Sequence, residues 1–362
     1  MRTRFLTIAL SALGMLAACS EPTGPALESP SASVARGATR TVTAMTQNMY
    51  VGADVDAVIG ALASPDPSDD IPALLVAIET LGATDYPARA GALAAAIAKA
   101  RPHVVGLQEV SQIDIDLTAL GLPAVVHLDF LAILGDSLAA RGLQYAVAVK
   151  VRNIVAQPLP GIGLVDYDAI LVDADRVTVT ATEARTFAHN LGVVAPGVEL
   201  KRGWVLARVL IGGAPYAFAN THLESGAAAG LSDLRAAQAM ELVSGLSADV
   251  PTMVLGDLND IPGSAMHHVL SGARFIDSWA ALRGGAPGFT CCQRADLGNH
   301  VSALDQRIDY VWTRGFQGHR ELDGRVWRIG TEPRDRIPGP LHPIWPSDHA
   351  GLVLTVAEAP AH

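Results

Sequence analysis

Residues 252–260 read Thr-Met-Val-Leu-Gly-Asp-Leu-Asn-Asp. The apolar run at 252–255, which ends at a glycine, predicts a short buried strand. Asp257 and Asn259 follow directly, where the strand gives way to a loop. Residues of this kind most often form an Asx turn, so their meaning depends on what the other strand ends carry.

Four more segments carry polar residues at the ends of apolar runs. They are Gln47-Asn48-Met49, Gly106-Leu107-Gln108-Glu109-Val110, Asn220-Thr221-His222-Leu223-Glu224, and the late pair Arg307-Ile308-Asp309-Tyr310 with Ser347-Asp348-His349. Any one of them is weak evidence, since Glu109 alone could be a solvated strand end and His222 alone a core histidine. All five in this order point to loops that converge on one cleft.

The rest of the chain predicts many strands and few helices. Strands are expected at 41–49, 104–107, 144–150, 169–172, 177–182, 204–211, 216–221, 252–255, 308–312 and 351–356. Helices are expected at 87–99, with Asp85 as N-cap, at 133–141 and at 231–246. This pattern favours an α+β fold with mixed sheets over a regular parallel barrel. No repeat or low-complexity break interrupts residues 41–358, which we interpret as one domain.

The residue types at these ends suit phosphoester hydrolysis. A hard cation needs carboxylate oxygens, and Glu109 follows an apolar strand directly. A water must be deprotonated or aligned, which a histidine held by a carboxylate can do, as His349 with Asp309. The developing charge needs hydrogen-bond donors, and His222 and Asn259 can supply them.

Together the motifs resemble the endonuclease/exonuclease/phosphatase superfamily, which includes deoxyribonuclease-I-like nucleases, bacterial sphingomyelinases and inositol polyphosphate phosphatases. The resemblance implies a four-layer sandwich of two packed mixed β-sheets flanked by helices, and Mg²⁺ as cofactor, with Mn²⁺ as a substitute. It implies metal or phosphate contacts for Asn48, Glu109 and Asp348, and catalytic roles for His222, Asp257, Asn259, Asp309 and His349. Whether Asp257 or His349 is the base stays open. Tyr167 and Asp168 are candidates to support His222.

The N-terminus predicts export. Arg2 and Arg4 precede an apolar run that ends in Leu16-Ala17-Ala18-Cys19, which is typical of a lipoprotein signal peptide over residues 1–18. Cys19 would then carry the lipid, residues 19–40 would form a flexible tether, and the protein would sit in a bacterial envelope, at the outer membrane. The alternative is an ordinary secretory signal that releases a soluble protein.

The substrate class stays open at this point. A net charge of −10 argues against a broad nucleic-acid-binding surface but not against a local groove. Nucleic acid, phospholipid or inositol phosphate could be the substrate, as a phosphodiester or a monoester, and a non-catalytic binding protein on the same fold is the other alternative. We expect a monomer. Cys291 and Cys292 either form a disulfide or remain thiols, and we interpret them as stabilising a loop.

Overall fold

The computed structural model describes residues 40–118, 121, 125–316 and 322–358. The expected signal peptide at 1–18, Cys19, and all but the last residue of the expected tether at 19–40 lie outside the described residues. Arg40, the last residue of that tether, is already the first residue of strand β1.

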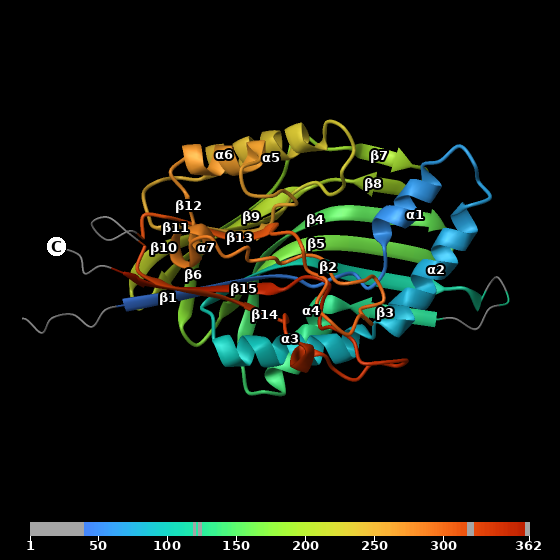
Figure 1. Ribbon diagram of the computed structural model, residues 1–362, viewed down its shortest axis with the longest axis horizontal. Helices are drawn as coiled ribbons and strands as arrows, with labels where there is room; N and C mark the ends of the chain where they lie inside the picture. The colour runs from blue at the N-terminus through green and yellow to red at the C-terminus, as the bar shows by residue number, and fades with distance from the viewer. Residues whose placement is uncertain (1–39, 119–120, 122–124, 317–321, 359–362) are drawn as a thin grey trace, which may run out of the picture. The chain divides into compact units, whose positions relative to one another are not determined.

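Two mixed sheets form the centre of the described structure (Figure 1). The first has the order β14 (Gly324–Ile329), β15 (Gly351–Glu358), β1 (Arg40–Asn48), β2 (Val104–Asp116), β5 (Ile162–Asp173), β4 (Tyr145–Leu159), β8 (Val198–Leu200), β7 (Gly192–Ala195), with β3 (Val125–Asp129) paired to β2. The second has the order β12 (Ile276–Asp277), β13 (Asp309–Arg314), β11 (Thr252–Asp257), β10 (Ala214–His222), β9 (Gly203–Ile211), β6 (Val177–Thr186). Among the strand pairs of the described residues, only β1–β2 and β10–β11 are parallel.

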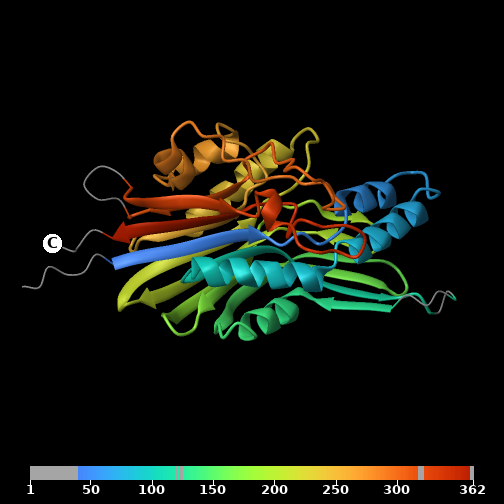
Figure 2. The same ribbon diagram turned by 60° about the horizontal axis from the view of Figure 1, so that its bottom comes forward.

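The alternation of side chains along each strand explains how the layers pack. Val42 and Ala44 of β1 lie in the core between the two sheets, whereas Met45 lies in the core on the outer face of the first sheet. Helices α3 (Tyr86–Ala100) and α4 (Phe130–Ala139) cover that outer face. Helices α5 (Leu231–Gly245) and α6 (Ala265–Gly272) cover the second sheet (Figure 2). The predicted four-layer α+β sandwich is confirmed.

Most predicted elements are present, with shifted ends. Asp85 caps α3, and its side chain accepts a hydrogen bond from the backbone N of Ala88 at 3.3 Å. Strand β2 runs nine residues beyond the predicted end at Leu107, because Val110 to Asp116 pair with β5 or β3 although many of them are polar. Helices α1 (Val55–Leu62), α2 (Asp70–Ala83) and α7 (Ser278–Arg283) were not predicted.

Within the described part of the chain, no helix combines the length and apolar character that crossing a membrane requires.

Candidate active site

One edge of the sandwich collects the ends of five strands. Asn48, His222 and Asp257 are the last residues of β1, β10 and β11. Asp309 is the first residue of β13, and because β13 runs antiparallel to β11 it pairs directly with Asp257. Strand β15 runs antiparallel to β1, so the preceding loop with His349 reaches the same edge. The topology therefore brings the predicted strand-end residues to one place.

Glu109 reaches this edge through a bulge in β2. The register between β2 and β5 shifts between Leu107 and Val110, and Glu109 itself has a φ of 55°. A bulge re-aims a side chain by inserting an extra residue into a strand. Here the carboxylate of Glu109 accepts hydrogen bonds from Asn48 Nδ2 at 2.9 Å and from the backbone N of Val51 at 2.8 Å.

Asn48 links a carboxylate of the first sheet, Glu109, to a carboxylate of the second sheet, Asp257. Its Nδ2 also donates to Asp257 Oδ2 at 3.1 Å, and its Oδ1 accepts from the backbone N of Tyr50 at 2.9 Å. The amide is fully buried, so both of its donated hydrogen bonds go to carboxylates. Asn48 therefore fixes Glu109 of the first sheet and Asp257 of the second at a set separation.

His349 and Asp309 form a buried pair. Nδ1 of His349 lies 2.8 Å from Asp309 Oδ2, and the ring's Nε2 lies 3.7 Å from Asp257 Oδ2. Burial alone would lower the pKa of His349, but the carboxylates of Asp309, Asp348 and Asp257 raise it well above its ordinary value. The Oγ of Ser347 accepts from the backbone N of His349 at 3.1 Å and holds the start of this loop.

His222 approaches the same carboxylate oxygen of Asp257. Its Nε2 lies 3.6 Å from Asp257 Oδ2, and burial, with the charges of Arg202 and His349, lowers its pKa well below the ordinary value. Nδ1 of His222 is buried and has no hydrogen-bond partner among the described residues. The Tyr167 hydroxyl does not support the ring, since it donates instead to Gln112, whereas the buried carboxyl of Asp168 interacts with the backbone of His222 and accepts no hydrogen bond from Nδ1.

Asn259 lines the same cleft in a left-handed backbone conformation, with a φ of 50°. Its backbone N donates to Asp257 Oδ1 at 2.9 Å, and its Nδ2 donates to the carbonyl of Leu223 at 3.0 Å. The Asx turn expected after β11 is thus present, and it fixes both the Asn259 amide and the Asp257 carboxylate.

The donor set of the cleft fits a hard divalent cation. Glu109, Asp257 and Asp348 all line it, and burial raises the pKa of both Asp257 and Asp348 to about 7. Grouped carboxylates that have lost water are stabilised by a bound cation, and oxygen ligands select Mg²⁺ or Mn²⁺ over softer metals. The carboxylates of Glu109 and Asp348 could hold such an ion, and Asn48, whose Nδ2 donates to Glu109, would lie beside it.

Several supporting residues were not assigned a role from the sequence. Arg89 of α3 is fully buried and donates to the carbonyls of Met49 and Tyr50 at 2.6 and 2.9 Å, and to that of Pro346 at 3.3 Å. It thereby ties the loop after Asn48 to the loop before His349. An alanine-rich helix gives no sign of this task, because its partners are backbone groups far away in the sequence.

The sheets are also linked below the cleft. Asn220 of β10 donates from Nδ2 to the carbonyls of Leu107 and Ala169 at 2.9 and 3.0 Å, across the core between the sheets. A Cβ at Gly106 would lie 2.5 Å from Asn220 Oδ1, so this link requires a glycine in β2. The glycine at the start of the Gly106–Val110 motif therefore has a packing reason.

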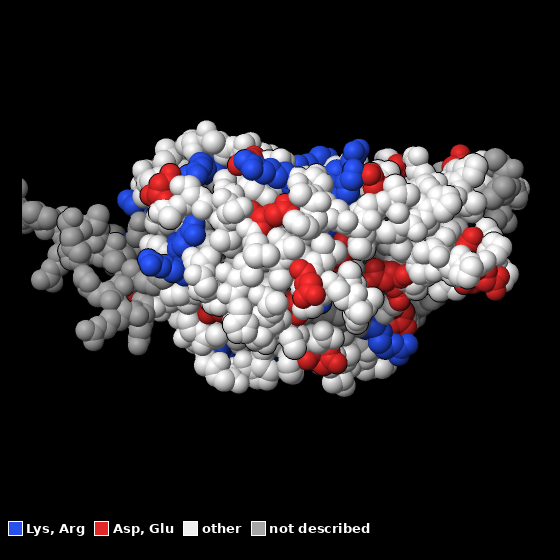
Figure 3. Space-filling model, turned by 90° about the horizontal axis from the view of Figure 1, so that it is seen from above, with Lys and Arg blue, Asp and Glu red and all other residues white. Residues whose placement is uncertain are grey.

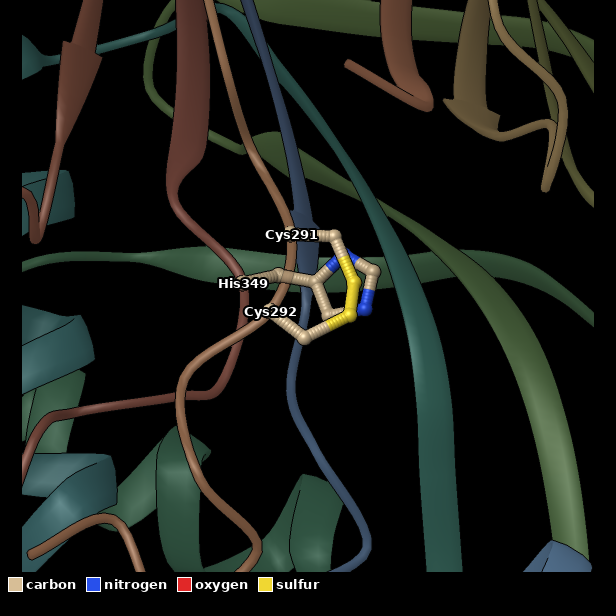
Figure 4. Close-up of side chains that lie close together, drawn as sticks. All are labelled: Cys291, Cys292 and His349. Carbon is tan, nitrogen blue, oxygen red and sulfur yellow. A yellow bond between two sulfur atoms is a disulfide. The ribbon is translucent and has the colours of Figure 1, made fainter. Parts of the chain in front are cut away.

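Cys291 and Cys292 are joined in a disulfide, which closes one of the alternatives left by the sequence. Figure 4 shows the sulfur atoms beside the ring of His349, and Sγ and ring-nitrogen atoms of the three residues lie within 4.8 Å of one another. The flanking backbone pairs with the His349 loop, through Gln293 N to Asp348 O at 2.8 Å and Ala350 N to Thr290 O at 2.7 Å. The disulfide thus forms part of the cleft wall that supports His349.

The cleft has a volume of about 490 Å³, and most of the charged residues that line it are acidic. Asp54, Asp56, Glu109, Asp166, Asp257 and Asp348 line it. Arg202 is its one Lys or Arg among the described residues, and it is paired with buried Glu224 at 3.3 Å. Figure 3 shows Lys and Arg mainly along the upper edge of one face, whose middle carries acidic and uncharged residues. The cleft therefore lacks the row of cations with which nucleases follow a phosphate backbone.

Comparison with known proteins identifies the family. Residues 45–349 match the model of the Endonuclease/Exonuclease/phosphatase family. Among curated protein sequences, no significant match is found.

Solved structures share the fold at low sequence identity. An endonuclease/exonuclease/phosphatase from Beutenbergia cavernae is 22% identical, with a TM-score of 0.59, and the match covers 88% of this chain and 72% of that one. The human Nocturnin catalytic domain with bound sulfate is 16% identical, with a TM-score of 0.53 and coverages of 87% and 94%. A family protein from Bacteroides thetaiotaomicron is 13% identical, with a TM-score of 0.54 and coverages of 89% and 99%.

Proposed function

Because the chain belongs to the endonuclease/exonuclease/phosphatase family, we propose that it is a Mg²⁺-dependent phosphoester hydrolase and that its substrates are phosphodiesters. One observation carries the proposal. Oδ2 of Asp257 lies 3.6 Å from His222 Nε2 and 3.7 Å from His349 Nε2, and Asn48 links Asp257 to Glu109. A base for the attacking water, charge-stabilising donors and cation ligands thus meet in one cleft.

Each residue has a proposed task in the in-line attack of water. Asp257 aligns the attacking water and accepts its proton, because its carboxylate lines the cleft close to both histidine rings. His349, held in one orientation by Asp309, carries positive charge toward the phosphoryl oxygens. His222 remains neutral and donates a hydrogen bond, and Asn259 positions the phosphoryl group.

The cation would be held by Glu109 and Asp348, with Asn48 beside them. When bound, Mg²⁺ neutralises charge on the phosphate and favours the departure of the leaving oxygen. Mn²⁺, which accepts the same oxygen ligands, should replace it.

The proposal is tested by hydrolysis of bis(p-nitrophenyl) phosphate and p-nitrophenyl phosphate, followed with Mg²⁺, with Mn²⁺ and with excess EDTA. We expect the diester to be cleaved faster, chelation to abolish cleavage, and either metal to restore it. The His349→Gln variant should lose activity, while His268→Gln, on the exposed side of α6, should keep it. Full activity in EDTA, or in His349→Gln, would refute the proposed site.

We also propose that the protein is exported and tethered to the cell envelope through a lipid on Cys19. The support is Leu16-Ala17-Ala18-Cys19 behind a basic and apolar leader. Several acyl chains would be needed for stable anchoring, because one chain binds a membrane only marginally. In a bacterial host, the full chain should fractionate with membranes and Cys19→Ser with soluble proteins. A soluble wild-type protein outside the cell would favour the ordinary secretory signal.

A further inference from the structure

An apolar pocket lies next to the catalytic cleft, beneath helices α1 and α2. It has a volume of about 90 Å³, and its walls come from α1 and α2, from β2, β4, β5 and β8, and from the loop after β1. No charged residue lines it. The helix residues that line it include Ile59 and Leu62 of α1 and Leu74, Ala77 and Ile78 of α2. Cavities of this character stay dry and take up apolar molecules.

The pocket and the cleft share a wall. Val51, Ala53, Val55 and Leu164 line both of them. Val51 is also the residue whose backbone N donates to Glu109. The pocket therefore lies directly beside the cleft, on the side of the loop whose backbone holds Glu109.

Helix α1 covers the pocket with side chains that stay partly exposed to solvent. None of its residues is buried, and the side chains that face the pocket are only half-buried. The outward side of α2 is apolar as well, since Ile71, Leu75 and Val76 are 49%, 50% and 63% exposed. Exposed apolar side chains grouped at a binding site indicate contact with an apolar partner.

We propose that this pocket binds an alkyl chain of the substrate, so that the phosphoester cleaved at the site belongs to an amphiphile of the phospholipid class. This inference rests on the proposed phosphodiesterase function and names its substrate. The lining of the cleft agrees with it, because a polyanionic nucleic acid would meet carboxylates there instead of a row of Lys and Arg. A soluble inositol phosphate would have no use for the apolar pocket.

The test is a series of p-nitrophenyl alkyl phosphodiesters, from methyl to octyl, kept below the concentrations at which they aggregate. Burying a methylene group contributes about 0.8 kcal/mol, which corresponds to roughly a fourfold gain in kcat/KM. We expect kcat/KM to rise by about that factor for each of the first few carbons and then to level off once the pocket is full.

Variants of the pocket should change this dependence in opposite directions. Ala77→Phe fills the pocket and should flatten the rise, whereas Leu62→Ala enlarges it and should move the plateau to longer chains. Ala73→Phe is the matched control, because Ala73 lies on the same helix but does not line the pocket. It should behave as the wild type, with folding of all variants checked by circular dichroism.

The outcomes separate the two proposals. Cleavage of bis(p-nitrophenyl) phosphate with no effect of chain length would overturn the alkyl pocket and leave the hydrolase proposal intact. No cleavage of any diester would overturn the hydrolase proposal, and calorimetry then tests the pocket alone. Octyl phosphate should bind at least tenfold more tightly than methyl phosphate, and this preference should be lost in Ala77→Phe and kept in Ala73→Phe. Equal binding of the two phosphates would overturn the pocket.

Discussion

Asn48 is the residue that joins the carboxylates of the two sheets beneath the cleft. It is fully buried, and its amide donates to one carboxylate from each sheet, Glu109 and Asp257. A buried carboxylate is costly unless donors or a cation compensate it. The amide at position 48 therefore allows two acidic side chains to lie close together before any metal binds.

The Asn48→Asp variant tests this role. The substitution is nearly isosteric, but it replaces two donated hydrogen bonds with repulsion between three carboxylates. We expect activity to fall on the order of 10²-fold or more, and the melting temperature to fall in EDTA and to recover partly with Mg²⁺. Thermal unfolding and diester hydrolysis measure both effects. Wild-type activity, or a melting temperature that does not respond to Mg²⁺ differently from the wild type, would contradict the bridging role.

At the residue scale, the sequence predicted which side chains meet but not how they are held. Asp257, Asp309 and His349 stand at strand ends, and the topology necessarily brings those ends together. Asn48 links two carboxylates and Arg89 links two loops, and both do so through hydrogen bonds to residues far away in the chain. Local patterns carry no information on such contacts, so these roles had to come from the structure.

At the scale of elements, apolar patterning predicted the strands and missed the first two helices. Residues 252–257 form a buried strand as the apolar run indicates. Helices α1 and α2 were missed because α2 carries apolar side chains on its exposed side as well as its buried side. A helix without a polar face lacks the periodic signal that identifies a helix in sequence. The apolar exposed side of α2 therefore prevented its prediction from the sequence, and the same side supports the proposed contact with an apolar ligand.

The Cys291–Cys292 loop supports the His349 loop mainly through backbone hydrogen bonds. Changing both residues to serine removes the sulfur–sulfur bond but leaves those hydrogen bonds in place. We therefore expect the double variant to fold and to lose less than about tenfold in kcat, since a geometry kept by other contacts costs little catalysis. Steady-state kinetics with and without a reductant on the wild type check this. A loss of hundreds-fold would show that the sulfur atoms themselves contact the reacting groups.

For the whole molecule, His103 links stability to pH. Its Nδ1 accepts from the backbone N of Thr43 at 3.1 Å, and burial, followed by the charge of Arg176, lowers its pKa to about 4. An unfolded chain binds this proton near its ordinary pKa of about 6.5. As pH falls from about 6.5 toward 4, protons therefore favour the unfolded state, and stability is lost in that window.

The His103→Gln variant should remove that contribution. Urea unfolding at several pH values between 7 and 4 should give the wild type a steeper loss of unfolding free energy than His103→Gln. His127→Gln, at an exposed position on β3, is the matched control and should follow the wild type. Identical pH profiles for wild type and His103→Gln would contradict the assignment.

The most direct test of the proposed catalytic site is a double-mutant cycle on His349 and Asp309. The hydrogen bond of 2.8 Å between them predicts that they act as one unit. With diester hydrolysis measured at saturating Mg²⁺, His349→Ala should cost on the order of 10³-fold in rate or more. Asp309→Ala should also cost heavily, because the ring loses its orientation. The double variant should be little worse than the worse single variant. Fully multiplicative losses in the folded variants would contradict the pairing on which the proposed mechanism depends.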